Sequence, residues 1–367
     1  MTEAAIDRLL DESHIIVCTG AGGVGKTTAS AALALRAADR GRRAIVCTID
    51  PARRLAQSLG LSELGNEPNR VERAGSKRGE LDAMMLDMKR TFDEMVLEMA
   101  SPARAEQIMS NPFYKHVSST LAGTQEYMAM QKLFELHEEG RWELIVIDTP
   151  PTRSALDFLD APKRLTDFLE GRFLKLMLWP YMKAGKGGMK VLNFGTQIAL
   201  KTVTRITGSD LFADVGAFFQ AFEGMYEDFK NRAKRVRELL AARRTSFIVV
   251  TSPTGSSLRE AQYFTERLRA ENMPIGGIVV NRTHLVPEVA GLEDPGALAE
   301  RAQGPLAGAL EAYAAWRAVS VREKHLLDAA TGLERLPVWR VPDLADEVCD
   351  LKTLRAVGDL IADDKAG

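Results

Sequence analysis

The sequence predicts an α/β protein in which a mostly parallel, doubly wound β-sheet is flanked by helices. Short apolar runs alternate along the chain with longer helical segments, which is typical of strands joined by helical crossovers. The runs are apolar almost continuously, as expected for strands that are buried on both faces. The expected strands span residues 14–19, 44–49, 83–88, 143–149, 247–252, 276–281 and 337–341.

Two connections between these strands are too long for simple crossovers. Residues 89–140 and 153–244 are rich in Met, Phe, Leu and Lys and carry few strand signals. We expect both segments to be helical and to form one subdomain beside the sheet. The whole chain, residues 1–367, is then a single domain with a split helical insertion.

The composition excludes several classes of protein. The 367 residues are 46% hydrophobic and 27% charged with a net charge of -2, so we expect a globular protein with no nucleic-acid partner. No apolar stretch approaches the roughly 18 residues needed to cross a bilayer, and the N-terminus lacks a signal-peptide pattern. We expect a cytoplasmic protein, with peripheral membrane contact left open.

Cysteine spacing argues against a structural metal site. The three cysteines, Cys18, Cys47 and Cys349, form no CxxC pair and match no zinc or iron–sulfur spacing. Because Cys18 and Cys47 lie inside expected strands, we interpret them as small buried hydrophobic residues rather than reactive thiols.

The segment GAGGVGKTT carries the strongest chemical signal in the chain. It reads G-x-x-x-x-G-K-T from Gly20 to Thr27, follows an expected strand and precedes an alanine-rich helix. Glycines let backbone amides converge on phosphate oxygens, Lys26 places a positive charge near the β- and γ-phosphates, and the Thr27 hydroxyl can ligate Mg²⁺. The order of strand, GKT and helix argues against a mere helix-capping turn. The predicted nucleotide contacts are Gly20, Ala21, Gly22, Gly23, Val24, Gly25, Lys26, Thr27 and Thr28.

Two aspartates at strand ends fit the same site. Asp148 ends the apolar strand in ELIVIDTPPT (143–152), a position from which a carboxylate holds the Mg²⁺ shell directly or through water. Asp50 follows the strand in TIDPARRL (48–55), where the loop could orient the attacking water. Either residue alone could be a helix cap or turn former. Together behind a P-loop they favour a catalytic role for Asp50 with Lys26, and metal binding by Asp148 with Thr27.

A polar side chain also ends the expected strand at residues 276–281. Asn281, in IVVNR (278–282), has a paired donor and acceptor that suit the edge of adenine. The segment VPDLADEV (341–348), which includes Pro342 and Asp343, could form the loop over the base. These residues complete a predicted site for ATP and Mg²⁺.

The motifs GGVGKTT, DPARRL, VIDTPPT, VVNR and VPDLADEV occur in this order and span nearly the whole chain. The chain thereby resembles the ArsA and guided-entry (tail-anchored protein targeting) ATPases, a branch of the dimeric deviant P-loop class. Residues 113–136 resemble the bacterial anion-transporting-ATPase-like members. The resemblance implies a P-loop ATPase that works as a dimer with facing ATP sites and helical subdomains that rearrange with nucleotide state.

The resemblance also implies a role for individual residues. It makes Asp50 the water-positioning residue of the first switch and Asp148 the metal-side residue of the second. Lys26 and Thr27 would bind phosphate and Mg²⁺, and Asn281 would read adenine.

One departure from the family loop stands out. Relatives commonly read GKGGVGKTT, with a first lysine that reaches the partner subunit's phosphates, whereas this chain has Ala21 at that position. A cation supplied in trans can be worth roughly 10³-fold or more in rate. Three explanations stay open: a slow homodimeric ATPase, a heterodimer whose partner supplies the lysine, or replacement in cis by Arg53 or Arg54.

The absence of cysteine clusters limits which substrates the protein can bind. Arsenite-handling members bind the metalloid through clustered thiolates, and the three cysteines here form no such cluster, so we expect no arsenite. The CxxC that joins the eukaryotic dimer through zinc is also absent, so a dimer must be held by packing and nucleotide.

Two classes of function remain. The first is an ATPase switch whose helical surface binds a hydrophobic or membrane-associated client. The second is a Min/Par-like partitioning ATPase that acts on membrane or nucleoid. Residues 171–209 contain no Asp or Glu and are basic, apolar and interrupted by glycines. This stretch fits a cover over a hydrophobic groove or a membrane contact, or a packed helix with solvated lysines.

Overall fold

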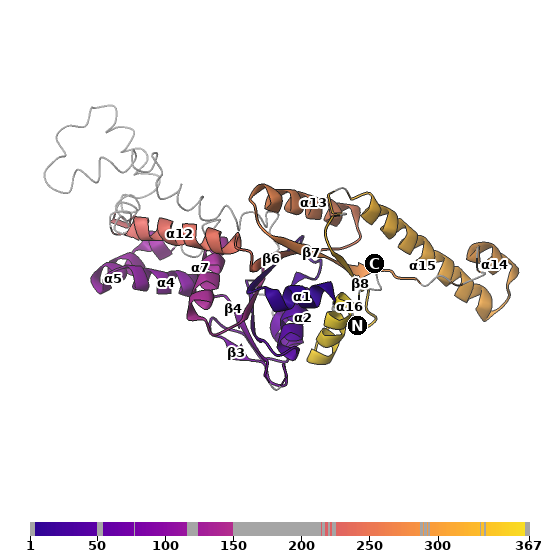
Figure 1. Cartoon of the computed structure of the whole chain (residues 1–367), viewed down its shortest axis with the longest axis horizontal. Helices are drawn as coiled ribbons and strands as arrows, with labels where there is room; N and C mark the ends of the chain where they lie inside the picture. The colour runs from indigo at the N-terminus through magenta and orange to yellow at the C-terminus, as the bar shows by residue number, and fades with distance from the viewer. Residues whose placement is uncertain are drawn as a thin grey trace, which may run out of the picture. The chain divides into compact units, whose positions relative to one another are not determined.

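The computed structural model of the chain is shown in Figure 1. It describes residues 4–49, 54–76, 78–115, 124–149, 214, 217, 218, 221, 225–286, 289, 292, 294–330, 332, 333 and 335–363. The chain forms two compact units. The first comprises Met1–Met85, Leu136–Leu156 and Leu240–Gly367, and the second comprises Leu86–Glu135 and Asp157–Leu239.

An eight-stranded sheet in the order β3-β4-β2-β5-β1-β6-β7-β8 forms the centre of the first unit. Only β3 is antiparallel, and it pairs with β4 at one edge. The expected α/β class with a mostly parallel sheet is thereby confirmed. The strands are β1 (Ile15–Thr19), β2 (Arg43–Thr48), β3 (Asn69–Arg70), β4 (Glu80–Met85), β5 (Leu144–Asp148), β6 (Thr245–Thr251), β7 (Ile275–Thr283) and β8 (Val338–Pro342).

Two details of the sheet differ from the sequence prediction. The strand expected at residues 83–88 lies at Glu80–Met85, because Asp87 already caps the next helix by accepting a hydrogen bond from the Arg90 amide at 2.9 Å. The short strand β3 was not expected. Two residues are too few to produce a periodic pattern.

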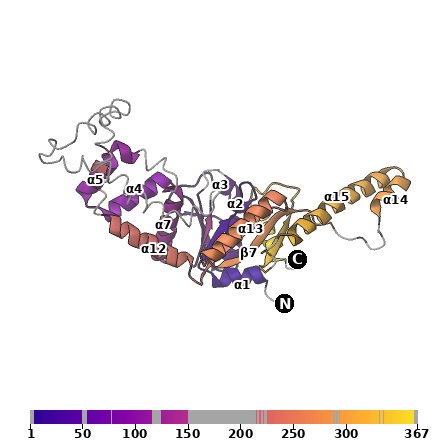
Figure 2. The ribbon, with the colours of Figure 1, turned by 90° about the horizontal axis from the view of Figure 1, so that it is seen from above.

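Helices cover both faces of the sheet. α1, α2 and α16 lie against one face, and α13 packs on β6 and β7 at the other (Figure 1). α15 projects away from the sheet in both views and carries α14 near its far end (Figure 2). The helices of this unit are α1 (Ala5–Glu12), α2 (Lys26–Asp39), α3 (Arg54–Ser58), α13 (Gly255–Ala270), α14 (Pro295–Arg301), α15 (Pro305–Asp328) and α16 (Leu351–Ala362).

The described part of the second unit is helical. Its helices are α4 (Met88–Met99), α5 (Pro102–Ser110), most of α7 (Thr124–Glu139) and most of α12 (Tyr226–Leu240). Tyr114 is buried between Phe92 and Phe218, and its hydroxyl donates to Asp93 at 2.7 Å. Burial, first of all, together with this hydrogen bond raises the pKa of Tyr114. An aromatic cluster therefore organises this core.

The structure describes several methionines of the helical insertion but not its basic stretch. Three methionines of the Met-rich insertion, Met95, Met128 and Met130, are each at most 1% exposed and pack in its core. The basic stretch 171–209 lies outside the described residues. None of the described helices combines the length and the apolar character needed to cross a bilayer.

A buried carboxylate holds the β4 edge of the sheet together. Asp82 is 2% exposed and accepts hydrogen bonds from Arg70 Nε at 2.7 Å, Arg141 Nη2 at 2.8 Å and Trp142 Nε1 at 2.9 Å. These donors come from β3 and from the turn before β5. A buried carboxylate is tolerated where donors surround it, so Asp82 in β4 can hold both β3 and the turn before β5.

A second ion cluster joins α1 to α2. Asp7 accepts a hydrogen bond from Arg36 Nη2 at 2.9 Å, and Arg40 Nη1 lies 3.2 Å from the same carboxylate oxygen. Burial by itself raises the pKa of Asp7, but the hydrogen bond and charge of Arg36, with the charge of Arg40, outweigh it and hold that pKa below its ordinary value. The pair favours the ionised carboxylate in the folded state.

This cluster predicts a pH-dependent contribution to stability. We expect Asp7→Asn to lower the free energy of unfolding by about 1–3 kcal/mol at pH 7, because it removes a charged partner of two arginines. The lowered folded pKa means that this contribution is complete above the ordinary pKa of about 3.9 and is lost as pH falls through the folded value. Urea unfolding at pH 7 and pH 3 measures the difference, which should shrink at pH 3. Asp359→Asn, which removes the exposed partner of Arg36, is the control and should change stability by less than about 0.5 kcal/mol.

Candidate nucleotide-binding site

The glycine-rich loop lies at the carboxyl end of central strand β1 and leads into α2. A ligand in an open parallel sheet binds at this edge, beside the strand where the chain order reverses. Gly25 precedes α2 with φ 95°, and a Cβ there would lie 2.2 Å from Asn281 Nδ2. A Cβ at Gly20, which has φ 151°, would lie 2.0 Å from the Val250 carbonyl oxygen. Both positions therefore require glycine.

Lys26 points back over this loop. Its side chain is buried, and Nζ donates to the carbonyl oxygens of Gly20 at 3.0 Å and Ala21 at 2.8 Å. The ammonium group is thus held where phosphate oxygens would meet the loop amides. This geometry fits the predicted phosphate contact.

Ala21 occupies the position at which the family resemblance leads us to expect a lysine. The residue is 8% exposed and belongs to the hydrophobic core, as does Val24 on the other side of the loop tip. Gly22 and Gly23 between them are exposed. Ala21 and Val24 therefore anchor the loop on both sides, and no cation projects from position 21.

Asp148 lies at the centre of the polar site. Its carboxylate is fully buried, and Oδ2 accepts hydrogen bonds from Thr27 Oγ1 at 2.7 Å and Thr48 Oγ1 at 2.9 Å. The parallel register places Thr48 beside Asp148 on the neighbouring strand. Hydroxyl and carboxylate oxygens are the ligand types that Mg²⁺ prefers, so Thr27 and Asp148 fit this ion.

Asn281 contacts the loop directly. Its side-chain Nδ2 donates to the Val24 carbonyl oxygen at 2.9 Å, although the two residues are 257 positions apart in the sequence. This contact joins the end of β7 to the P-loop. The P-loop thus accepts one hydrogen bond from the side-chain amide of Asn281, which fixes β7 to the loop.

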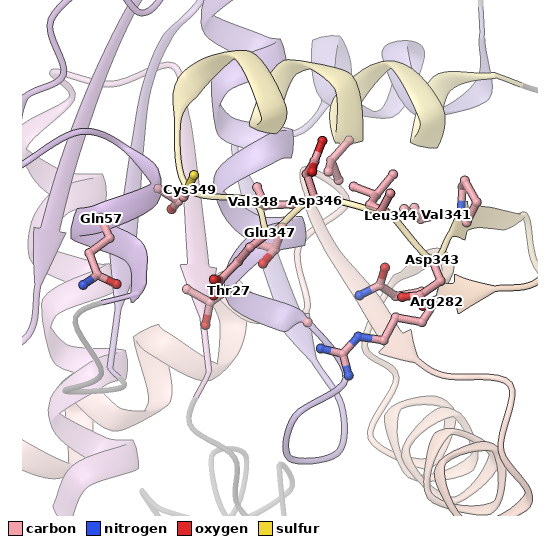
Figure 3. Close-up of a pocket in the computed structure, with 17 residues that line it drawn as sticks. Thr27, Gln57, Arg282, Val341, Asp343, Leu344, Asp346, Glu347, Val348 and Cys349 are labelled. Carbon is pink, nitrogen blue, oxygen red and sulfur yellow. The ribbon is translucent and has the colours of Figure 1, made fainter.

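A cavity of about 650 Å³ extends from the first turn of α2 to the loop after β8 (Figure 3). Its size suits a ligand as large as a nucleotide. It brings together the predicted residues Thr27, Asn281, Pro342 and Asp343. The lining residues are Gly25, Thr27, Thr28, Gln57, Ser58, Asn281, Arg282, Val341, Pro342, Asp343, Leu344, Ala345, Asp346, Glu347, Val348, Cys349 and Val357.

Some predicted residues lie outside the described part of the chain. Asp50 and Arg53 are among them, and Arg54 begins α3 without a described side chain. The roles predicted for these three residues therefore stay predictions.

Other residues of the site were not found from the sequence. Thr48, a hydrogen-bond partner of Asp148, lies inside the quoted motif TIDPARRL, and its place at a strand end was the available signal. Gln57, Ser58 and Cys349 line the cavity but belong to no recognisable motif. Cys18 and Cys47 are buried as expected, and burial above all raises the pKa of Cys18 to about 12.

Comparison with known proteins places this site in a family. The sequence pattern of the family described as "Anion-transporting ATPase" matches residues 13–363. The chain belongs to this family. It is therefore an ATPase and binds ATP, and members of the family are typically dimeric.

Individual relatives of this ATPase are distant but cover most of the chain. A protein of Aquifex aeolicus (strain VF5) is 24% identical over 96% of this chain and 79% of that protein. Its name, arsenical pump-driving ATPase 1, was assigned to it by inference. ATPase GET3 of Malassezia globosa is 26% identical over 76% of this chain and 75% of that protein. ATPase ASNA1 homolog 1 of Paramecium tetraurelia is 26% identical over 72% and 73%, respectively.

Cys349 makes nucleotide binding in the cavity measurable. It is exposed and lines the cavity, whereas Cys18 and Cys47 are buried. We expect one thiol per folded chain to react rapidly with an alkylating reagent, and MgATP to slow that reaction at least several-fold. The rate of alkylation, followed by mass spectrometry, measures this effect. Cys349→Ser should abolish the fast reaction, and an unchanged rate with saturating MgATP would contradict binding in the cavity.

Proposed function

We propose that this ATPase is a dimeric MgATP-dependent switch that couples its nucleotide state to a helical surface for a hydrophobic or membrane-associated client. The arrangement of Lys26, Thr27 and Asp148 around the P-loop is the observation that carries the proposal. It places a cation, a hydroxyl and a buried carboxylate together at the carboxyl edge of the sheet.

Each of these groups has a proposed task. Lys26 and the loop amides bind the phosphates, and Thr27 with Asp148 would hold Mg²⁺, which supplies positive charge to the phosphate oxygens when bound. Thr48 keeps the Asp148 carboxylate oriented through its hydroxyl. Asp50 positions the attacking water, and Asn281, Pro342 and Asp343 contact the adenine base.

The connectivity supports a link between nucleotide state and the second unit. The second half of that unit begins at Asp157, shortly after Asp148, and its first half begins at Leu86, directly after β4. A change at the carboxyl end of β5 would therefore act only a few residues along the sequence before the second half of the helical unit begins. That the second unit carries a surface for a client is part of what we propose.

Ala21 leaves the source of a second cation open. A buried methyl group at this position cannot reach a partner's phosphate. We propose a dimer that is either a slow homodimer or a heterodimer whose related subunit supplies the lysine, with replacement by Arg53 or Arg54 as the third explanation. Light scattering with and without MgATP, for the chain alone and with a co-purified subunit, separates the first two.

Substitutions at the P-loop test the assigned roles. We expect Lys26→Gln and Asp148→Asn each to lower the ATPase kcat roughly 10²- to 10³-fold, because each removes a charged group that stabilises the transferring phosphate or its metal. Asp148→Asn should also raise the Mg²⁺ concentration needed for half-maximal activity. Steady-state phosphate release, measured across a Mg²⁺ series, tests both effects. Asp359→Asn is the matched carboxylate control, and equal activity of all variants would refute the assignment.

A binding assay distinguishes the proposed switch from a Min/Par-like partitioning ATPase. The full chain is mixed with a labelled apolar helical peptide and, separately, with anionic liposomes or DNA, in MgATP and in MgADP. Nucleotide-dependent binding of the peptide supports the client switch. Nucleotide-dependent pelleting with liposomes or DNA, without peptide binding, favours partitioning.

A further inference from the structure

We propose that Arg282 stacks its guanidinium group on the base of the bound nucleotide and thereby strengthens ATP binding. The proposal rests on the proposed function, because it requires the cavity to receive the base of ATP. It adds a residue to which the sequence motifs assigned no task.

The backbone at Arg282 is unusual. Arg282 has φ 59°, in the left-handed region that residues with a side chain seldom adopt. The register between β7 and β8 shifts between Asn281 and Thr283, so Arg282 occupies an irregularity in the strand pair. Bulges of this kind re-aim a side chain beside an active site, and a strained backbone persists only where its surroundings impose it.

Contacts on both sides impose this conformation. Before the bulge, Asn281 is held to the P-loop by the Val24 carbonyl. After it, Thr283 Oγ1 donates to the Val341 carbonyl at 3.1 Å, and the Thr283 carbonyl accepts from the Asp343 amide at 2.9 Å. Arg282 thus lies between two residues that are fixed by hydrogen bonds, Asn281 to the P-loop and Thr283 to β8 and the loop after it.

The side chain is exposed and extends from the end of β7 along the edge of the cavity that it lines (Figure 3). Arg282 is the only arginine or lysine among the described lining residues, which also include the exposed acids Asp343, Asp346 and Glu347. A cation attracts the electron-rich face of an aromatic ring. In this lining it also balances the negative charge of the three carboxylates.

The chemistry of the lining favours stacking on a base. No aromatic ring occurs among the described lining residues, so a planar partner for the base must be a guanidinium or an amide. Arginine is planar and weakly hydrated, and it stacks on aromatic faces. Apolar side chains such as Leu344 and Val348 are available to cover the other face of the ring. The phosphates have a separate cation in Lys26, which is not part of this lining.

Three variants of the full-length protein test the inference. Arg282→Gly removes the side chain and suits the left-handed backbone, whereas Arg282→Lys keeps the charge and the strain but loses the planar group. Arg73→Gly is the matched control, because Arg73 is an exposed arginine with φ 63° outside the cavity lining. Thermal unfolding without nucleotide should show all three variants folded, with midpoints no lower than that of the unsubstituted protein by more than a few degrees.

Calorimetric titration with MgATP and with magnesium tripolyphosphate, which lacks a base, gives the decisive comparison. We expect Arg282→Gly to weaken MgATP binding roughly 3- to 30-fold and to leave tripolyphosphate binding unchanged. Arg282→Lys should recover part of the loss, and Arg73→Gly should match the unsubstituted protein.

Two results would overturn the inference. Unchanged MgATP affinity in Arg282→Gly would show that the side chain does not contact the nucleotide. An equal loss for tripolyphosphate would make Arg282 a phosphate contact instead. Both results leave the proposed function standing. Its failure would appear separately, as Cys349 alkylation at an unchanged rate in MgATP or as no nucleotide-dependent binding of the apolar peptide by the unsubstituted protein.

Discussion

The buried carboxylate of Asp148 is the interaction on which the candidate site depends. It joins the end of β5 to Thr48 at the end of β2 and to Thr27 in the first turn of α2. A carboxylate that is shielded from solvent is stable only where hydrogen-bond donors contact it. The two threonine hydroxyls and the Asp148 carboxylate must therefore come together as the protein folds. The parallel sheet provides this meeting point, since its carboxyl ends converge at one edge. The geometry needed for a phosphate and a hard cation is therefore part of the folded architecture.

The P-loop is shaped by packing as much as by its glycines. Gly20 and Gly25 make the close approaches that a Cβ would prevent, while Ala21 and Val24 are embedded in the core on either side of the exposed tip. Lys26 then closes the loop from within by donating to its carbonyl groups. A loop built in this way is organised before ligand binds, which lowers the ordering cost of binding. The same packing explains why Ala21 offers no reach toward a partner subunit.

The cavity wall formed by β7 and β8 has an irregular backbone. A register shift, a left-handed arginine and an amide bonded to the P-loop all occur within a few residues of one another. The β6–β7 pairing has a register shift of its own, between Phe247 and Ile248, while ion clusters around Asp82 and Asp7 secure the edge of the sheet and its covering helices. What sets the β7–β8 wall apart is that its register shift coincides with a left-handed arginine in the cavity lining, and strained backbone of this kind is often found at ligand sites.

The amino-acid sequence by itself determined the fold class, the P-loop, and the placement of Asp148 and Asn281 at strand ends. Apolar runs and the spacing of GKT are patterns among neighbouring residues, so they can be recognised from the sequence alone. Only the tertiary structure decided that Thr48 donates a hydrogen bond to Asp148, that Asn281 donates to Val24, and that Cys349 lines the cavity. It also moved the third expected strand to Glu80–Met85 and added β3. These features depend on which strands are neighbours and in which register, and that order is set by the packing of the whole sheet rather than by any single segment.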